Sequence, residues 1–174
     1  MARSLARPLT RTSARPSAGP GALFEGDRAP AFSLPADGGE TVSLAGFKGR
    51  KLVLYFYPRA DTEGCTREAM DFSARAAAFA KAGTGILGVS ADPIAHQDAF
   101  KNKYKLKIPL GSDETLKVLK AYGVWVEKSM YGRKFMGIAR TTFLIGPAGR
   151  IARIWPKVKI PGHAEEVLEA AKEL

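Results

Sequence analysis

The chain has 174 residues, of which 45% are hydrophobic and 25% charged, and it contains a single cysteine. This length and composition predict one globular domain with an extension, while one cysteine excludes an internal disulfide scaffold and favours a reducing compartment. The net charge of +10 is compatible with nucleic-acid binding, but no basic and aromatic recognition motif accompanies it, so we do not expect nucleic acid as a partner. No apolar run approaches the ~18 residues that span a bilayer, so we do not expect a membrane as a partner either.

The first 24 residues form a basic segment that is rich in Ser, Ala and Pro and has no acidic residue. Every fourth position from Arg3 to Arg15 is an arginine, and the segment has too few large apolar groups to fold, so residues 1–24 are predicted to be disordered. Organelle transit peptides have the same composition. Two interpretations stay open: a tail on a cytoplasmic bacterial protein, or a targeting segment for a mitochondrion or plastid. The folded domain is expected at residues 25–174.

Strand and helix patterns alternate along that domain. Two β-prone segments around Asp37-Gly38-Gly39 predict a hairpin, and continuous apolar runs predict strands that are buried on both faces. Asp92 and Pro93 are expected to open a helix as N-cap and first residue. The order predicts an α/β fold in which helices flank a central mixed sheet, preceded by an N-terminal β-hairpin. Expected strands are 31–34, 41–44, 51–57, 85–90, 141–145 and 150–155; expected helices are 65–82, 93–104, 114–122 and 164–174.

The stretch most informative about chemistry is 57–68, YPRADTEGCTRE, between a predicted buried strand and the start of a helix. Strand ends of this kind bind ligands in open α/β sheets. Cys65 falls in the first helical turn, where free N–H groups and the helix dipole favour a thiolate. Thr62 is expected to cap the helix and to point its hydroxyl into the same pocket, and Pro58 to stiffen the loop. The alternative is a buried core cysteine, but the polar, loop-like neighbours favour a reactive one.

The spacing Pro58-x-x-x-Thr62-x-x-Cys65 matches the active-site signature of peroxiredoxins. More narrowly, YFYPRADTEGCTREAMDF resembles the bacterioferritin comigratory protein group, also called peroxiredoxin Q. The resemblance continues through residues 26–32, 131–138, 140–145 and 162–167. It implies a thioredoxin-like fold and an antioxidant enzyme that reduces hydrogen peroxide and organic hydroperoxides without metal, haem or flavin.

The resemblance also implies roles for individual residues. Cys65 would be the nucleophile that attacks the peroxide and becomes a sulfenic acid. Arg140 would stabilise the thiolate and the charge that develops on the peroxide oxygen. Thr62 would align the peroxide, and Glu68 would organise the site by pairing with an arginine.

One position departs from the group's pattern. Many members carry a second cysteine five residues after the first, where this chain has Met70. The chain therefore resembles a one-cysteine variant, whose sulfenic acid needs the thiol of another molecule: thioredoxin, glutaredoxin or glutathione, or transiently a second subunit. A monomer or weak homodimer is implied by resemblance alone. Two alternatives remain, a peroxide sensor and a thiol–disulfide oxidoreductase, although the latter should show Cys-x-x-Cys.

Two weaker patterns are set aside. Residues 83–88 match G-x-G-x-x-G, but a dinucleotide site needs this motif after a strand and before a helix, whereas here it follows a predicted helix. His96 and His163 have no cysteine or acidic partners at metal-ligand spacing, so no metal site is expected.

Overall fold

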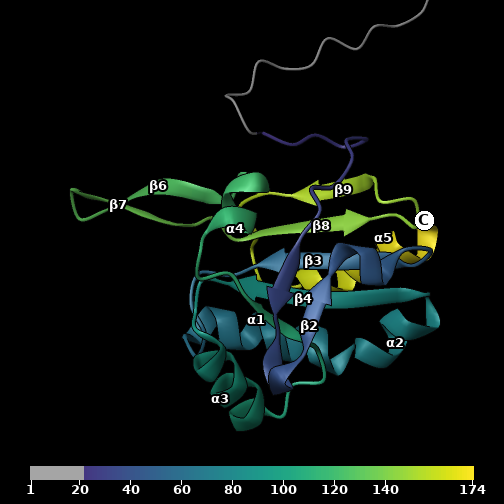
Figure 1. Cartoon of the computed structure of the whole chain (residues 1–174), viewed down its shortest axis with the longest axis horizontal. Helices are drawn as coiled ribbons and strands as arrows, with labels where there is room; N and C mark the ends of the chain where they lie inside the picture. The colour runs from purple at the N-terminus through teal and green to yellow at the C-terminus, as the bar shows by residue number, and fades with distance from the viewer. Residues whose placement is uncertain (1–21) are drawn as a thin grey trace, which may run out of the picture.

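The computed structural model describes residues 22–174, and positions 1–21 of the segment expected to be disordered lie outside it. Within the described range, a five-stranded sheet has the order β5-β4-β3-β8-β9 (Figure 1). Strands β3, β4 and β5 are parallel, and β8 and β9 add antiparallel strands on the other side of β3. The strands are β1 (Ser33–Pro35), β2 (Thr41–Ser43), β3 (Lys51–Phe56), β4 (Thr84–Ser90), β5 (Leu110–Ser112), β6 (Trp125–Met130), β7 (Arg133–Ile138), β8 (Thr141–Ile145) and β9 (Ile151–Trp155).

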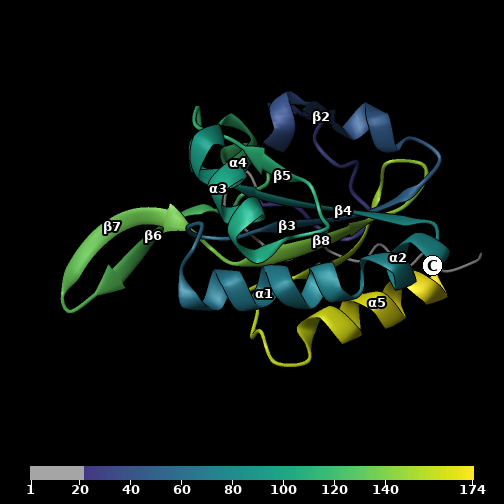
Figure 2. The same ribbon diagram turned by 90° about the horizontal axis from the view of Figure 1, so that it is seen from below.

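Helices cover both faces of this sheet. Figure 2 shows α1, α2 and α5 side by side beneath it, with α4 and the β1–β2 pair on the opposite side. The helices are α1 (Glu63–Ala74), α2 (Ala76–Lys81), α3 (Ile94–Tyr104), α4 (Lys117–Ala121) and α5 (His163–Glu173). The predicted α/β fold with a mixed sheet and an N-terminal β-hairpin is confirmed.

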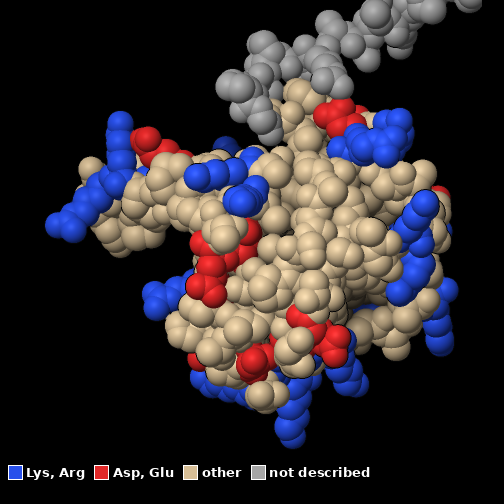
Figure 3. Space-filling view, viewed as in Figure 1, with Lys and Arg blue, Asp and Glu red and all other residues tan. Residues whose placement is uncertain are grey.

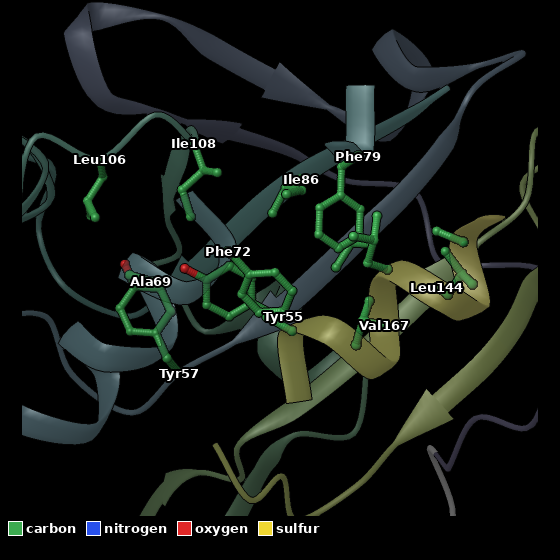
Figure 4. Packing of buried hydrophobic residues seen from close by; sticks show 14 of the residues in the cluster. Tyr55, Tyr57, Ala69, Phe72, Phe79, Ile86, Leu106, Ile108, Leu144 and Val167 are labelled. Carbon is green, nitrogen blue, oxygen red and sulfur yellow. The ribbon is translucent and has the colours of Figure 1, made fainter. Parts of the chain in front are cut away.

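Alternation along the central strands explains why both faces are apolar. Tyr55 and Val53 face the helices α1, α2 and α5, while Leu54 and Phe56 face α4 and β1. Figure 4 shows the first of these clusters, in which Tyr55 stacks on Phe72 with ring centroids 4.7 Å apart. This packing fixes α1 against the sheet and so fixes the first turn of α1 at the end of β3.

Three predicted helices need correction. The single helix expected at 65–82 is two helices, because Arg75 leaves the helical region with φ −104° and ψ 6°. Asp92 does not cap α3, since its carboxylate accepts hydrogen bonds from Ala60 and Ser90 instead, and Pro93 precedes the first helical residue. The helix expected at 114–122 is confined to α4, because Leu116 adopts a left-handed conformation with φ 65°.

The sequence patterns also missed strands β5, β6 and β7. Strands β6 and β7 form an antiparallel hairpin, Trp125–Ile138, which we call the arm because it projects from the body (Figures 1 and 2). Tyr131 and Gly132 make its turn with φ values of 51° and 75°, a geometry that suits a tight two-residue hairpin turn. Among residues 22–174, no helix combines the length and apolar character needed to cross a bilayer.

Candidate active site

Cys65 lies in the first turn of α1, directly beyond the C-terminal end of β3, as the sequence predicted. Its backbone position among the first N–H groups of the helix favours a negative charge on sulfur. Its side chain, however, is only 1% exposed and is part of the apolar cluster between α1 and the sheet. The sequence set a buried core cysteine against a reactive one as alternatives. Cys65 combines features of both, because it is buried and also contacts a cation.

That cation is Arg140, in the short link between β7 and β8. Its Nη2 lies 3.3 Å from Cys65 Sγ, and its Nη1 donates to Glu68 Oε1 at 2.8 Å. The residues are 75 and 72 positions apart in the sequence, so only the fold brings them together. One guanidinium thus connects a sulfur and a carboxylate on the same helix, with the fixed geometry that arginine provides.

Glu68 is almost fully buried, with a side chain that is 2% exposed. Burial raises the pKa of this carboxyl from 4.5 to about 7, although the charge and hydrogen bond of Arg140 act in the opposite direction. Its second oxygen, Oε2, accepts no hydrogen bond from any residue of the described range. Burial thus favours the neutral form of Glu68, whose other oxygen contacts the same guanidinium as Cys65.

Gly64 gives the guanidinium the space that it occupies. A Cβ on residue 64 would lie 3.3 Å from Arg140 Nη2 and 3.2 Å from Ile160 Cδ1, both tight contacts. With any larger residue here, Arg140 Nη2 and Ile160 Cδ1 would each have to move by a few tenths of an ångström. The sequence alone did not indicate this requirement, because it arises from a chain segment almost one hundred residues away.

Pro58 and Thr62 lie in the loop between β3 and α1, on the approach to Cys65. Thr62 occupies the N-cap position of α1, but its hydroxyl donates to the carbonyl oxygen of Arg59 at 2.8 Å, so the expected side-chain cap is absent. Beside the first turns of α1 is an open pocket of about 420 Å³. Thr62 and Met70 both line this pocket, whereas Cys65, Glu68 and Arg140 do not.

A hydrogen-bond network attaches the loop between β3 and α1 to β4 and α3. The backbone N–H of Ala60 donates to Asp92 Oδ2 at 2.8 Å, and Ser90 Oγ donates to the same oxygen at 2.6 Å. Gln97 Nε2 donates to Ser90 Oγ at 2.9 Å, and the Tyr57 hydroxyl donates to Gln97 Oε1. The network links β3, β4 and α3 to the Cys65 loop. Sequence reasoning missed it because Asp92 before a proline looked like a helix cap.

Of the two histidines that the sequence offered, His163 lies in the packed core between α1, β8 and β9. His163 is buried between the rings of Phe72 and Trp155, and its Nε2 lies 2.8 Å from Thr142 Oγ1. Burial lowers its pKa from 6.5 to about 4, so it is neutral at physiological pH. Across residues 22–174, no cluster of three His, Cys, Asp or Glu side chains could hold a metal ion.

Comparison with known proteins places this geometry among related chains. Residues 25–154 match the model of the AhpC/TSA family. A peroxiredoxin of Coxiella burnetii is 48% identical over 143 residues, which cover 82% of this chain and 95% of that protein. Peroxiredoxin Bcp of Bacillus subtilis is 42% identical over 149 residues, covering 86% of this chain and 95% of the relative.

Solved structures agree with these matches. Peroxiredoxin Q of Xanthomonas campestris superposes with a TM-score of 0.78 at 44% identity, over 82% of this chain and 90% of the other. A cysteine-to-serine mutant of peroxiredoxin Q from Xylella fastidiosa gives a TM-score of 0.83 at 38% identity, over 87% and 96% of the two chains. A Xanthomonas campestris bacterioferritin comigratory protein is 43% identical with a TM-score of 0.78, over 82% of this chain and 90% of that one. That structure is described in terms of the protein's alkyl peroxide reduction activity.

Proposed function

The chain belongs to the AhpC/TSA family and is a thiol-dependent peroxidase of the Bcp/peroxiredoxin Q type, and from this premise we propose that Cys65 is its peroxide-reducing nucleophile. The observation that carries the proposal is the 3.3 Å approach of Arg140 Nη2 to Cys65 Sγ at the start of α1. A guanidinium and a helix N-terminus both favour the thiolate, which is the form that attacks peroxides.

In the first step, the Cys65 thiolate attacks one peroxide oxygen and the O–O bond breaks. A sulfenic acid forms on sulfur, and the departing oxygen takes a proton and leaves as water or an alcohol. Arg140 is positioned to donate to the oxygen on which negative charge develops, while Thr62 orients the peroxide and Pro58 keeps the loop rigid. Glu68 acts as a positioning residue, because it touches Arg140 rather than the reacting sulfur.

In the second step, an external thiol attacks the sulfenic sulfur, releases water and leaves a mixed disulfide. A further thiol then frees Cys65. An external donor is required because the sequence has one cysteine and Met70 stands where the group's second cysteine occurs. We propose thioredoxin, glutaredoxin or glutathione as that donor, a cytoplasmic location in line with the bacterial relatives, and a monomer or weak homodimer.

A reductant panel tests both steps. The full chain is assayed for consumption of hydrogen peroxide and of an alkyl hydroperoxide with dithiothreitol, thioredoxin, glutaredoxin or glutathione as donor. Cys65→Ser should abolish consumption with every donor and retain the wild-type circular dichroism spectrum and thermal midpoint. Peroxide turnover by the folded Cys65→Ser variant would refute the assignment of the nucleophile.

A further inference from the structure

The arm exposes large apolar side chains along a hairpin whose root adjoins the active site. Met130 is 58% exposed and Phe135 is 43% exposed, and each arm strand packs chiefly on the other. A two-stranded hairpin of this kind gains little stability by itself, and an exposed apolar patch next to a site marks an interaction surface. The arm also leads directly to the site, because β7 ends at Ile138, two residues before Arg140.

The strand register divides the arm into two chemically different faces. Cross-strand partners share a face: Met130 pairs with Arg133, and Lys128 pairs with Phe135. These four residues form what we call the Cys65 face, which carries two cations and no acid. The opposite face carries Glu127, Lys134 and Met136, and Glu127 and Lys134 form an ion pair at 3.7 Å.

Lys128 shows which face turns toward the site. Its stem lies over Gly137, with Cδ 3.3 Å from the position that a Cβ would take there, so it runs toward the root of the arm. Burial lowers the Lys128 pKa, the Arg140 charge lowers it further and the Cys65 charge raises it, which agrees with this direction of the stem. Figure 2 shows the arm at the same end of the molecule as the first turn of α1.

The positive charge of the molecule indicates which kind of partner binds the Cys65 face. A second copy would bring its own net charge of +10 against the first, which disfavours self-association. Figure 3 shows basic side chains at the free end of the arm, where Arg133 and Lys134 lie. A partner with an acidic and apolar surface complements both the cations and the exposed Met130 and Phe135.

The geometry points to the Cys65 face of the arm as the docking surface for the protein that supplies the resolving thiol, a reductant whose thiol lies within an acidic and apolar surface. This inference rests on the proposed function, because only a sulfenic acid on Cys65 requires such a donor. Docking on the arm holds the donor close to the start of α1, where Cys65 lies, so the effective concentration of the attacking thiol rises.

Two matched double variants test the docking surface. Arg133→Ala with Phe135→Ala removes one cation and one aromatic side chain from the Cys65 face. Lys134→Ala with Met136→Ala removes one cation and one apolar side chain from the opposite face of the same strand. The probe is thioredoxin with its reductase and NADPH, and dithiothreitol-supported turnover of each protein serves as the internal reference.

We expect KM for thioredoxin to rise about tenfold or more in the first variant and to stay within about twofold of wild type in the second, as interface contacts of ~1 kcal/mol each would give. Dithiothreitol-supported turnover should be unchanged in both. Equal effects of the two variants, or loss of dithiothreitol turnover in the first, would overturn the inference.

Other outcomes separate the alternatives. If wild type turns over with glutathione but with no protein donor, the inference is overturned while the proposed function stands. If sedimentation shows that the first variant dissociates a wild-type dimer while thioredoxin kinetics are unchanged, the face binds a second copy and the inference again fails. Absence of wild-type turnover with dithiothreitol would instead contradict the proposed function.

Discussion

Arg140 is shared between the Glu68 carboxyl and the Cys65 sulfur, and this sharing sets the chemistry of the site at the scale of single residues. Its two terminal nitrogens contact Glu68 and Cys65 separately, so neither contact excludes the other. Glu68 lies where burial favours its neutral form, which leaves more of the guanidinium charge available to the thiolate. The carboxyl then orients Arg140 without fully neutralising it.

Arg140→Ala should slow oxidation of Cys65 by hydrogen peroxide by about 10²-fold or more, the usual effect of losing one donor to a developing oxyanion. Stopped-flow fluorescence would measure the rate of Cys65 oxidation. Arg67→Ala is the matched control, because Arg67 is exposed and lies on the same helix only two residues from Cys65. Equal rates in the two variants would remove Arg140 from the mechanism.

Arg140→Lys separates charge from geometry at the same position. An ammonium group is a single point of charge and cannot hold the two fixed directions of the guanidinium. We expect a peroxide rate between those of wild type and Arg140→Ala, measured in the same stopped-flow experiment. A rate equal to that of wild type would show that charge alone suffices and that the bidentate geometry is not used.

At the scale of elements, the loop between β3 and α1 is attached to the sheet by Asp92. The residue lies just beyond β4, and its carboxylate accepts the N–H of Ala60 and the hydroxyl of Ser90. Cys65 is 1% exposed, and Ala60 of this loop packs against the cluster that buries it, so we expect a bulky thiol to reach the sulfur only when the loop moves. The strength of the Asp92 contacts therefore limits how often the site opens.

Asp92→Ala should increase the rate at which Cys65 reacts with the bulky disulfide reagent DTNB several-fold, because loss of a charged hydrogen-bond acceptor favours local opening. Hydrogen exchange at residues 59–66 should accelerate in parallel. Asp98→Ala is the control: its carboxylate also accepts a backbone N–H, that of Gly38 at 2.9 Å, but away from the site. Equal acceleration in both variants would contradict a specific role for Asp92.

The sequence predicted the elements whose pattern reflects the core, and it missed those whose role depends on distant partners. Strands β3, β4 and β8 are continuous apolar runs buried on both faces, so composition alone located them. The arm mixes charged and apolar residues without strict alternation in an exposed hairpin, which gives no burial signal. Asp92 resembles a helix cap in the sequence, but in the fold its carboxylate accepts the N–H of Ala60.

The same distinction applies to the site. Cys65 was predicted from local features, namely its position after a buried strand and at a helix start. Its contact with Arg140 joins residues 75 positions apart and could be expected only from resemblance to a family. The 1% exposure of Cys65 was not predicted, because the loop sequence is polar while its apolar cover comes from α1 and the sheet.

For the whole molecule, two buried groups give opposite dependences of stability on pH. Glu68 has its pKa raised from 4.5 to about 7, so between these values the folded state keeps a proton that the unfolded chain releases, and rising pH destabilises the fold. His163 has its pKa lowered from 6.5 to about 4, so in that range the unfolded chain binds the extra proton and rising pH stabilises the fold. Between pH 4.5 and 6.5 the two contributions oppose each other.

Removing either side chain should reveal how the other one changes stability with pH. In Glu68→Gln, the free energy of unfolding should rise more steeply with pH across the overlap than in wild type, because only the His163 contribution remains. In His163→Gln, the slope of the free energy of unfolding against pH should be more negative than in wild type, because only the Glu68 contribution remains. Urea titrations at half-unit pH intervals measure these slopes, each of which should differ from wild type by up to ~1.4 kcal/mol per pH unit, the value for one proton. All other titrating groups are common to the three proteins, so parallel curves would show that neither residue changes its proton affinity on folding.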